Sequence, residues 1–165
     1  MNATQMTIAD FSKGPAPGWV FVADGVMGGV SDGGAMQAGT LRLSGRVSTE
    51  NNGGFLQVRH RFDAPWPGAA DGVELTVRGN GELYYVFLKT WQLTRPWQSY
   101  RAAFGTGPDW LTHRLPFAGF TRSHAEIADA FRHTDVRSLA FVAYGRDHEA
   151  DLSVARVALY GPDAR

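Results

Sequence analysis

The feature that most restricts the fold of this chain is an alternation of apolar and polar residues that recurs along most of its length. In residues 73–78, for example, three apolar side chains alternate with three polar ones. Successive side chains of a β-strand point to opposite faces, so this pattern predicts strands with one buried face. Segments with this pattern, or with a short apolar run of strand length, are residues 19–22, 40–47, 55–62, 73–78, 83–88, 100–104, 110–117, 139–144 and 152–160.

Glycine-rich and asparagine-rich segments separate the predicted strands. They predict turns at residues 31–34, 51–54, 65–68, 79–81 and 105–107. About eight to ten short strands at this spacing favour a β-sandwich or a barrel. One helix is predicted over residues 123–133, because Ser123 followed by Glu126 is a capping-box pattern. The expectation is an all-β fold with one short helix, forming a single domain over residues 1–165.

Charge and cysteine content exclude several classes of function. The chain has 16 Lys+Arg and 16 Asp+Glu, and this balance disfavours a nucleic-acid binder, which normally carries a basic excess. There is no cysteine, which fits a reducing compartment. No signal peptide and no apolar run of about 20 residues is visible, so a cytoplasmic protein without direct membrane insertion is expected. Abundant glycine, and arginine in place of lysine, are typical of a GC-rich bacterial genome.

Two glycine-rich motifs carry the densest local signals. The first is Asp24-Gly-Val-Met-Gly-Gly-Val-Ser31, where Asp24, Gly28, Gly29 and Ser31 are interpreted as a structural turn. A phosphate cradle is the alternative, but the spacing matches neither of the common nucleotide-binding motifs. The second is Glu50-Asn-Asn-Gly-Gly54, where Asn51, Asn52, Gly53 and Gly54 are interpreted as a tight hairpin loop. A calcium or carbohydrate site is the alternative there, since the side-chain oxygens are suitable ligands.

A candidate binding surface follows from the polar sides of three predicted strands. Arg59 and Arg78 lie opposite the apolar residues of their strands. If these strands are neighbours, both guanidinium groups project from one sheet surface. Tyr85, Phe87 and Lys89 join them if the intervening residues of their strand face the core. Aromatic rings beside arginines are typical of recognition surfaces, although a loop or helix of the same chain could instead cover this face.

The tryptophans and histidines provide a second set of candidates. Trp91 and Trp97 flank a short loop and are expected to be exposed contact residues, whereas Trp19 and Trp110 are expected in the core. No histidine pair has the HExxH spacing of a zinc site, and no GxSxG motif marks a nucleophile. A non-enzymatic protein without metal or cofactor is therefore predicted.

Four ordered blocks resemble the complex I intermediate-associated protein family, the thirty-kilodalton assembly-factor domain, over about residues 8–160. Trp19 followed by Asp24-Gly-Val-Met-Gly-Gly-Val-Ser31 is similar to the first block. Gly45-Arg-Val-Ser-Thr-Glu-Asn-Asn-Gly-Gly-Phe55 is similar to the second, and Arg78-Gly-Asn-Gly81 with Tyr84 to the third. Residues 100–104, Trp110 and Leu115-Pro-Phe117 resemble the fourth.

The resemblance implies a jelly-roll β-sandwich of the galactose-binding-like type, in a bacterial stand-alone member. Mitochondrial members are assembly factors that act as chaperones for respiratory complex I. Two departures bear on function: Asn80 replaces the usual acidic residue of the third block, which weakens any ion or sugar site there. Tyr85 and Phe87 are apolar where the family is often polar, which favours a protein contact.

Two functional hypotheses follow. The first is a binding domain that helps to assemble a respiratory or other protein complex by docking subunits or assembly intermediates on the exposed sheet face. The second is a small-molecule binder similar to a carbohydrate-binding module, with Trp91 and Trp97 as ring platforms for a glycan. An unrecognised hydrolase is a third, weaker alternative.

Overall fold

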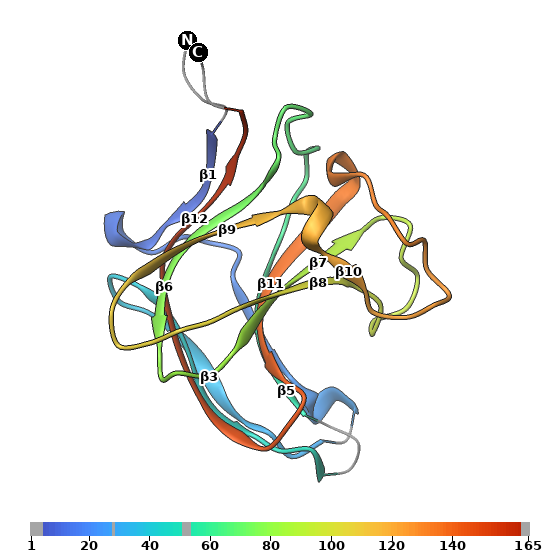
Figure 1. The fold of residues 1–165 in the computed structure, drawn as a ribbon. Coiled ribbons are helices and arrows are strands. Elements are labelled where there is room, and N and C mark those ends of the chain that lie inside the picture. Colours follow the sequence, from blue (N-terminus) through green and yellow to red (C-terminus); the bar gives the residue numbers. More distant parts are fainter. Residues whose placement is uncertain (1–4, 28, 51–53, 163–165) are drawn as a thin grey trace.

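The computed structural model describes residues 5–27, 29–50 and 54–162, which form two six-stranded antiparallel sheets packed face to face (Figure 1). Sheet A contains β1 (Gln5–Asp10), β3 (Asp32–Gln37), β4 (Leu41–Val47), β6 (Gly72–Gly79), β9 (Leu111–Pro116) and β12 (His148–Tyr160). Sheet B contains β2 (Val20–Ala23), β5 (Phe55–Arg61), β7 (Tyr84–Thr90), β8 (Tyr100–Phe104), β10 (Thr121–Arg122) and β11 (Val136–Tyr144).

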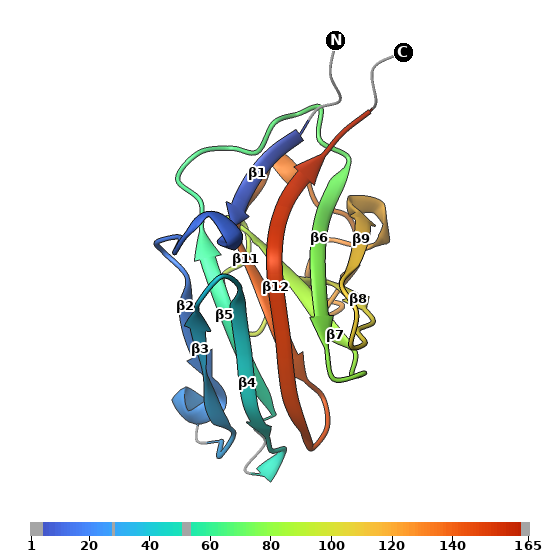
Figure 2. The same ribbon diagram turned by 90° about the vertical axis from the view of Figure 1, so that its left-hand side faces the viewer.

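The long strand β12 organises sheet A, whose strand order is β3-β4-β12-β6-β9 (Figure 2). One edge of β12 pairs with β4 through His148–Val154 and then with β1 through Arg156–Tyr160. The other edge of β12 pairs with β6. Strands that are far apart in the sequence therefore become neighbours, as in a jelly roll.

Strand β11 has the corresponding central position in sheet B, whose order is β10-β8-β7-β11-β5-β2. Its register with both neighbours places Ala140 beside Phe87 of β7 and Arg59 of β5. The next outward position, Val142, lies beside Tyr85 of β7. This register decides which side chains share a face of sheet B.

The core lies between the sheets and takes alternate residues from each strand. On β7 the pattern is regular: Tyr84, Val86 and Leu88 are fully buried, while the residues between them are half exposed. This alternation confirms the orientation that the sequence predicts for β7. The largest buried side chains are Phe11, Leu41, Leu43, Leu56, Trp66, Leu75, Tyr84, Leu88, Leu139, Phe141, Leu152 and Leu159.

The all-β prediction is confirmed, but the predicted helix over residues 123–133 is wrong. The helical turns in the described residues are short 3-10 turns at Phe11–Lys13, Asp24–Met27, Phe117–Gly119 and His133–Asp135. Ser123 does not cap a helix, because its hydroxyl accepts from the Ser99 amide of the neighbouring segment. Glu126 accepts from the Gln98 side chain instead of turning back to a helix end. These tertiary contacts outweigh a modest local helix propensity.

Of the described residues, none belongs to a helix that is long and apolar enough to cross a membrane. Three strands also lie outside the predicted set, among them the two-residue strand β10. Strand β1 was not predicted, and β3 begins inside the glycine segment that was predicted to be a turn.

Candidate functional site

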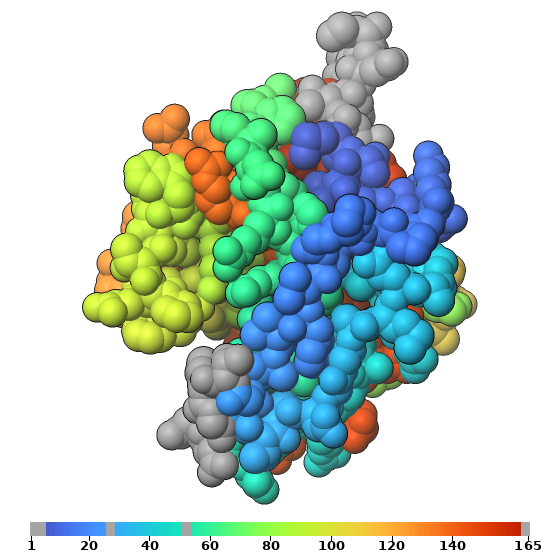
Figure 3. All heavy atoms as spheres, turned by 180° about the vertical axis from the view of Figure 1, so that it is seen from behind, coloured from blue at the N-terminus to red at the C-terminus, as the bar shows by residue number. Residues whose placement is uncertain are grey.

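The most distinctive surface of the molecule is the outer face of sheet B, the side that points away from sheet A. Alternate residues of four adjacent strands form it, and the loop after β7 stands out beside β5 as a yellow-green lobe (Figure 3). The face consists of Gln57, Arg59 and Arg61 of β5, Tyr85, Phe87 and Lys89 of β7, Arg101 and Ala103 of β8, and Ala140, Val142 and Tyr144 of β11.

An aromatic cluster occupies the middle of this face. The ring of Tyr144 contacts Tyr85 and Phe87 edge-on, at centroid separations of 4.6 and 5.2 Å. The guanidinium carbon of Arg101 lies 4.2 Å from the Phe87 ring centre and 5.2 Å from that of Tyr144. Edge-to-face and cation–π contacts of this kind fix the side chains in one arrangement. The cluster is therefore an ordered platform and not a loose group of rings.

Four cationic side chains surround the aromatic cluster: Arg59, Arg61, Lys89 and Arg101. The Lys89 amine donates to the carbonyl of Pro96, which lies in the loop after β7. Burial lowers the pKa of Lys89, and the positive charges of Arg59, Arg101 and Arg61 lower it further. Burial also lowers the pKa of Arg59, with a smaller contribution from Arg61. The face thus concentrates like charges in a partly desolvated environment.

The structure separates the two arginines that were predicted to share this face. Arg59 lies on β5 of sheet B, whereas Arg78 lies on β6 of sheet A. The Arg78 guanidinium packs instead over the exposed ring of Trp110, 4.8 Å from its centre. The predicted common surface for Arg59 and Arg78 is therefore wrong. Arg101 is the arginine that completes the face. The sequence signal that could have identified it is its position between Tyr100 and Ala102 in an alternating strand.

The first glycine motif forms a structural network around one carboxylate. Asp24 is fully buried and accepts hydrogen bonds from the hydroxyl and amide of Ser31 and from the amides of Gly54 and Phe55. Burial alone would raise the pKa of Asp24, but these hydrogen bonds outweigh it and hold the pKa below its usual value. A Cβ on Gly29 would lie 2.4 Å from the Asp24 carboxyl carbon, so glycine is required there.

This network joins the two glycine motifs, whose sequence patterns predict two separate turns. Gly28, Asn51, Asn52 and Gly53 lie outside the described residues. No group of three or more His, Asp or Glu side chains suited to a metal ion occurs in the part of the chain that the structure describes.

The third block of the family resemblance, Arg78-Gly-Asn-Gly81 with Tyr84, is also structural. The Tyr84 hydroxyl donates to the side-chain oxygen of Asn80 at 2.6 Å and accepts from the Asp151 amide at 2.9 Å. The Asn80 side chain in turn donates to the carbonyl of Glu149. These bonds link β7 of sheet B to β12 of sheet A at one end of the sandwich.

The tryptophans divide as predicted with one exception. Trp91 and Trp97 are 60% and 49% exposed, and Trp19 packs against the core. Trp110, predicted in the core, is instead 40% exposed. It precedes β9, an edge strand of sheet A.

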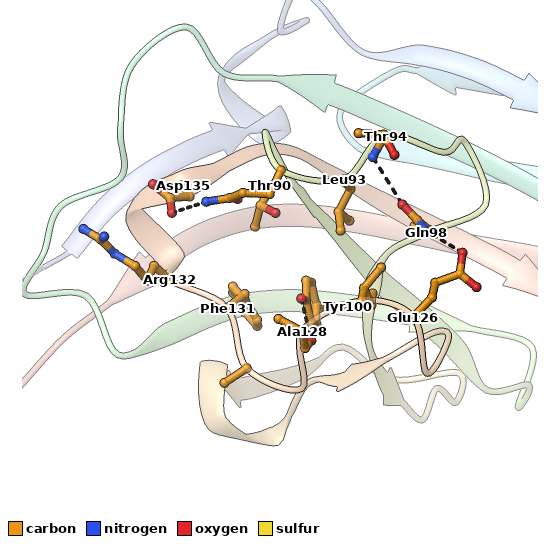
Figure 4. A pocket seen from close by; sticks show the side chains of 13 residues that line it. Thr90, Leu93, Thr94, Gln98, Tyr100, Glu126, Ala128, Phe131, Arg132 and Asp135 are labelled. Carbon is orange, nitrogen blue, oxygen red and sulfur yellow. Dashed lines mark hydrogen bonds between the residues drawn. The ribbon is translucent and has the colours of Figure 1, made fainter.

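A cavity of about 380 Å³ lies between the loop after β7 and residues 126–135 (Figure 4). Its polar groups are mostly bound to one another: Gln98 donates to Glu126 at 2.8 Å, and the Tyr100 hydroxyl donates to the carbonyl of Ala128 at 2.7 Å. No sequence pattern indicates this cavity, because residues 126–131 were predicted to be helical. Its contacts hold two loops together.

Comparison with known proteins identifies the family. Residues 9–154 match the family model described as "Complex I intermediate-associated protein 30 (CIA30)". The chain belongs to the CIA30 family. This confirms the family resemblance of the four sequence blocks, and a search of the curated proteins gives no match.

Solved structures show that the CIA30 chain has the fold of a jelly-roll carbohydrate-binding module. A family 11 carbohydrate-binding module from Clostridium thermocellum, in complex with a β-1,3-1,4-mixed-linked tetrasaccharide, is 12% identical, with a TM-score of 0.80. The same family's module from the cellulosomal cellulase Lic26A-Cel5E of that organism is 11% identical, with a TM-score of 0.82. Both comparisons cover 100% of this chain and 99% of the other. An agarase is 10% identical, with a TM-score of 0.67, over 100% of this chain and 25% of the agarase.

Proposed function

We propose that this chain is a non-enzymatic assembly factor that holds a protein partner on the outer face of sheet B. The partner is a subunit or an assembly intermediate of a membrane complex, with a respiratory complex as the first candidate. Membership of the CIA30 family over residues 9–154 supports the assembly role.

The single observation that carries the choice of surface is the ordered cluster of Tyr85, Phe87, Tyr144 and Arg101 on a half-exposed sheet face. Aromatic and arginine side chains are the residue types that dominate binding energy at protein interfaces. Their mutual packing keeps the face in one arrangement before a partner arrives, which lowers the entropic cost of binding.

Site-specific crosslinking in the native host tests this proposal. A photoreactive residue replaces Ala103, an exposed position on the outer face of sheet B, and in a second strain it replaces Thr112, an exposed position on β9 of sheet A. The expected result is that position 103 captures a subunit or insertion factor of a membrane complex and that position 112 does not.

Charge reversal provides the matched control. Arg59→Glu with Arg101→Glu should abolish the crosslink, whereas Arg78→Glu on sheet A should leave it intact. Equal capture at both positions, or a crosslink that survives the double reversal, rules out this face as the docking surface.

A second candidate function is glycan binding, which the exposure of Trp91 and Trp97 supports. The fold is that of carbohydrate-binding modules, one of which was solved with a bound tetrasaccharide. A glycan array and a titration of tryptophan fluorescence test this alternative. Binding that is lost in Trp91→Ala and Trp97→Ala supports it, and the absence of any glycan response removes it.

A further inference from the structure

The neutral net charge of the chain hides a strong separation of charge between its two sheets. The strands of sheet A balance five acidic residues (Asp10, Asp32, Glu74, Glu149, Asp151) against five arginines (Arg42, Arg46, Arg78, Arg114, Arg156). The strands of sheet B, all of them described, contain no Asp or Glu and six cationic residues, which are Arg59, Arg61, Lys89, Arg101, Arg122 and Arg137. The loop after β7, residues 91–99, is also free of acidic residues and adds Arg95.

The cations of the two sheets differ in their partners. On sheet A, Arg42 and Asp151 form a two-pronged ion pair with both distances at 2.9 Å, and Arg156 pairs with Glu74. Within the described part of the chain, Arg59, Arg61, Lys89 and Arg101 of the outer face form no ion pair. Like charges that are grouped without counter-charges repel one another and destabilise the folded state. Their concentration on one face therefore favours the binding of an anion from outside the chain.

The aromatic rings of the face are poorly placed to stack on a sugar or a base. Arg101 covers one side of Phe87, and Tyr144 forms T-shaped contacts with both Phe87 and Tyr85. A sugar or a base needs a free ring face, which these contacts reduce. What the face offers instead is the N–H donors of its arginines, a group that pairs with carboxylates in a two-pronged geometry. Two of the four cations also hold the loop after β7, because Lys89 donates to the carbonyl of Pro96 and Arg101 donates to the Ser99 hydroxyl and the Trp97 carbonyl.

The spacing of the cations fits an extended polypeptide. Arg59 and Arg61 are two residues apart on β5, so their side chains leave the same face about 7 Å apart. Carboxylates at alternate positions of an extended chain have the same spacing. Lys89 lies in the row of Arg61, across Ser138 of β11, at a distance of about two strand spacings, or about 10 Å. A further carboxylate of the same extended polypeptide can therefore reach Lys89.

We propose that the outer face of sheet B binds an extended acidic polypeptide segment whose alternating carboxylates pair with Arg59 and Arg61 and whose flank contacts Lys89 and Arg101. This proposal rests on the proposed function and specifies the chemistry of the partner. The loop after β7 forms a lobe beside β5 at one side of the molecule (Figure 3).

Peptide titration of the whole protein tests the chemistry directly. Three blocked twelve-residue peptides are compared by tryptophan fluorescence and by NMR: alternating Glu-Thr, alternating Gln-Thr, and a Glu-Glu-Thr-Thr repeat with the composition of the first. The alternating Glu-Thr peptide should bind at least tenfold more tightly than the Gln-Thr peptide and more tightly than the Glu-Glu-Thr-Thr repeat. Its affinity should fall several-fold between 50 and 200 mM NaCl, because exposed charge pairs are screened.

Variants locate the site. Arg59→Gln with Arg101→Gln should weaken the alternating acidic peptide at least tenfold, while Arg78→Gln on sheet A leaves its affinity unchanged. If the double variant does not fold, the wild-type preference for Glu-Thr over Gln-Thr and the NMR shifts on β5 and β7 still decide the question.

Three outcomes would overturn the proposal: equal affinity for the Glu-Thr and Gln-Thr peptides, equal damage by Arg78→Gln, or phosphatidylglycerol vesicles bound through Arg59 while the peptide is not. A partner crosslinked at position 103 together with failure of the acidic peptide would retain the docking function and reject only its acidic chemistry. Failure of both experiments would reject the two proposals together.

Discussion

At the scale of single residues, Asp24 determines how the two glycine motifs meet. Its carboxylate accepts from four donors in two other segments of the chain, at Ser31 and at residues 54–55. In Asp24→Asn the amide keeps one acceptor oxygen but points an NH₂ group at backbone N–H donors, which are then buried without a partner. We expect a loss of about 3 kcal/mol in the free energy of unfolding, measured by urea denaturation.

Asp10→Asn is the control for that substitution. Asp10 caps a short 3-10 turn and accepts from the amide and hydroxyl of Ser12. Its replacement should cost less than about 1 kcal/mol. A cost for Asp24→Asn no larger than that for Asp10→Asn would show that the carboxylate does not organise the motif.

The same carboxylate predicts how stability responds to acid. The pKa of Asp24 is lower in the folded chain than its ordinary value of 3.8, because its hydrogen bonds outweigh the effect of burial. The unfolded state therefore binds the proton first, and the contribution of Asp24 is fully present above about pH 4 and is lost as the pH falls through the folded pKa.

The measurement is the difference in unfolding free energy between the wild type and Asp24→Asn, taken from pH 7 to pH 2.5. Asp10, Asp135 and Asp147 also have lowered pKa values, because of hydrogen bonds from Ser12, Gln92 and Thr49. Their effects cancel in the difference. We expect it to be constant above pH 5 and to shrink below pH 4, and a difference independent of pH would contradict the assignment.

At the scale of strands, Tyr84 connects the two sheets through its hydroxyl. Tyr84→Phe removes the donor to Asn80 and the acceptor for the Asp151 amide while keeping the buried ring. We expect a loss of about 1 to 2 kcal/mol. Tyr85→Phe, one residue away on the outer face, is the control and should change stability by less than about 0.5 kcal/mol. Chemical denaturation of both variants checks the prediction, which fails if the two substitutions have the same effect.

Strands with alternating residues could be predicted from the sequence, because burial of one face imposes the period of two. Strand β3 escaped prediction for a physical reason. Its Gly33 faces Gly45 of β4, and a Cβ on Gly33 would lie 2.3 Å from the Ser44 carbonyl oxygen. These glycines allow the backbones of β3 and β4 to approach closely, but adjacent glycines in a sequence usually indicate a turn. The predicted helix over residues 123–133 fails for the opposite reason. The capping-box pattern is present in the sequence, but Ser123 and Glu126 bind other segments of the chain instead of a helix end.

The candidate surface was predictable strand by strand but not as a whole. Alternation places Tyr85, Phe87 and Lys89 on the outer side of β7, as the structure confirms. Which strands lie beside β7 depends on the crossovers between sheets, and no local pattern records these. Arg78 was therefore assigned to the wrong sheet, and Arg101 and Tyr144 were missed, although they complete the aromatic cluster.

At the scale of the whole molecule, a balanced total charge does not mean a balanced surface. Sheet A pairs several of its charges internally, whereas Arg59, Arg61, Lys89 and Arg101 on the outer face of sheet B form no ion pair with the described residues. The consequence can be measured at Lys89. Burial, followed by the charges of Arg59, Arg101 and Arg61, lowers its pKa below the ordinary value of 10.5. The folded state therefore releases the lysine proton before the unfolded state does, and stability rises as the pH increases from the folded pKa of Lys89 to about 10.5.

Because the chain has two lysines, Lys13 and Lys89, NMR of the ε-carbons can follow Lys89 directly, with Lys13→Arg assigning the signals. We expect Arg59→Gln to raise the pKa of Lys89, because the charge that contributes most to the repulsion is removed. Arg78→Gln, which removes a positive charge from the opposite sheet, should leave it unchanged. A bound acidic peptide should raise the same pKa in the wild type. If Lys89 titrates identically in wild type, Arg59→Gln and the peptide complex, its charge is not coupled to this face and the face is not a site for anions.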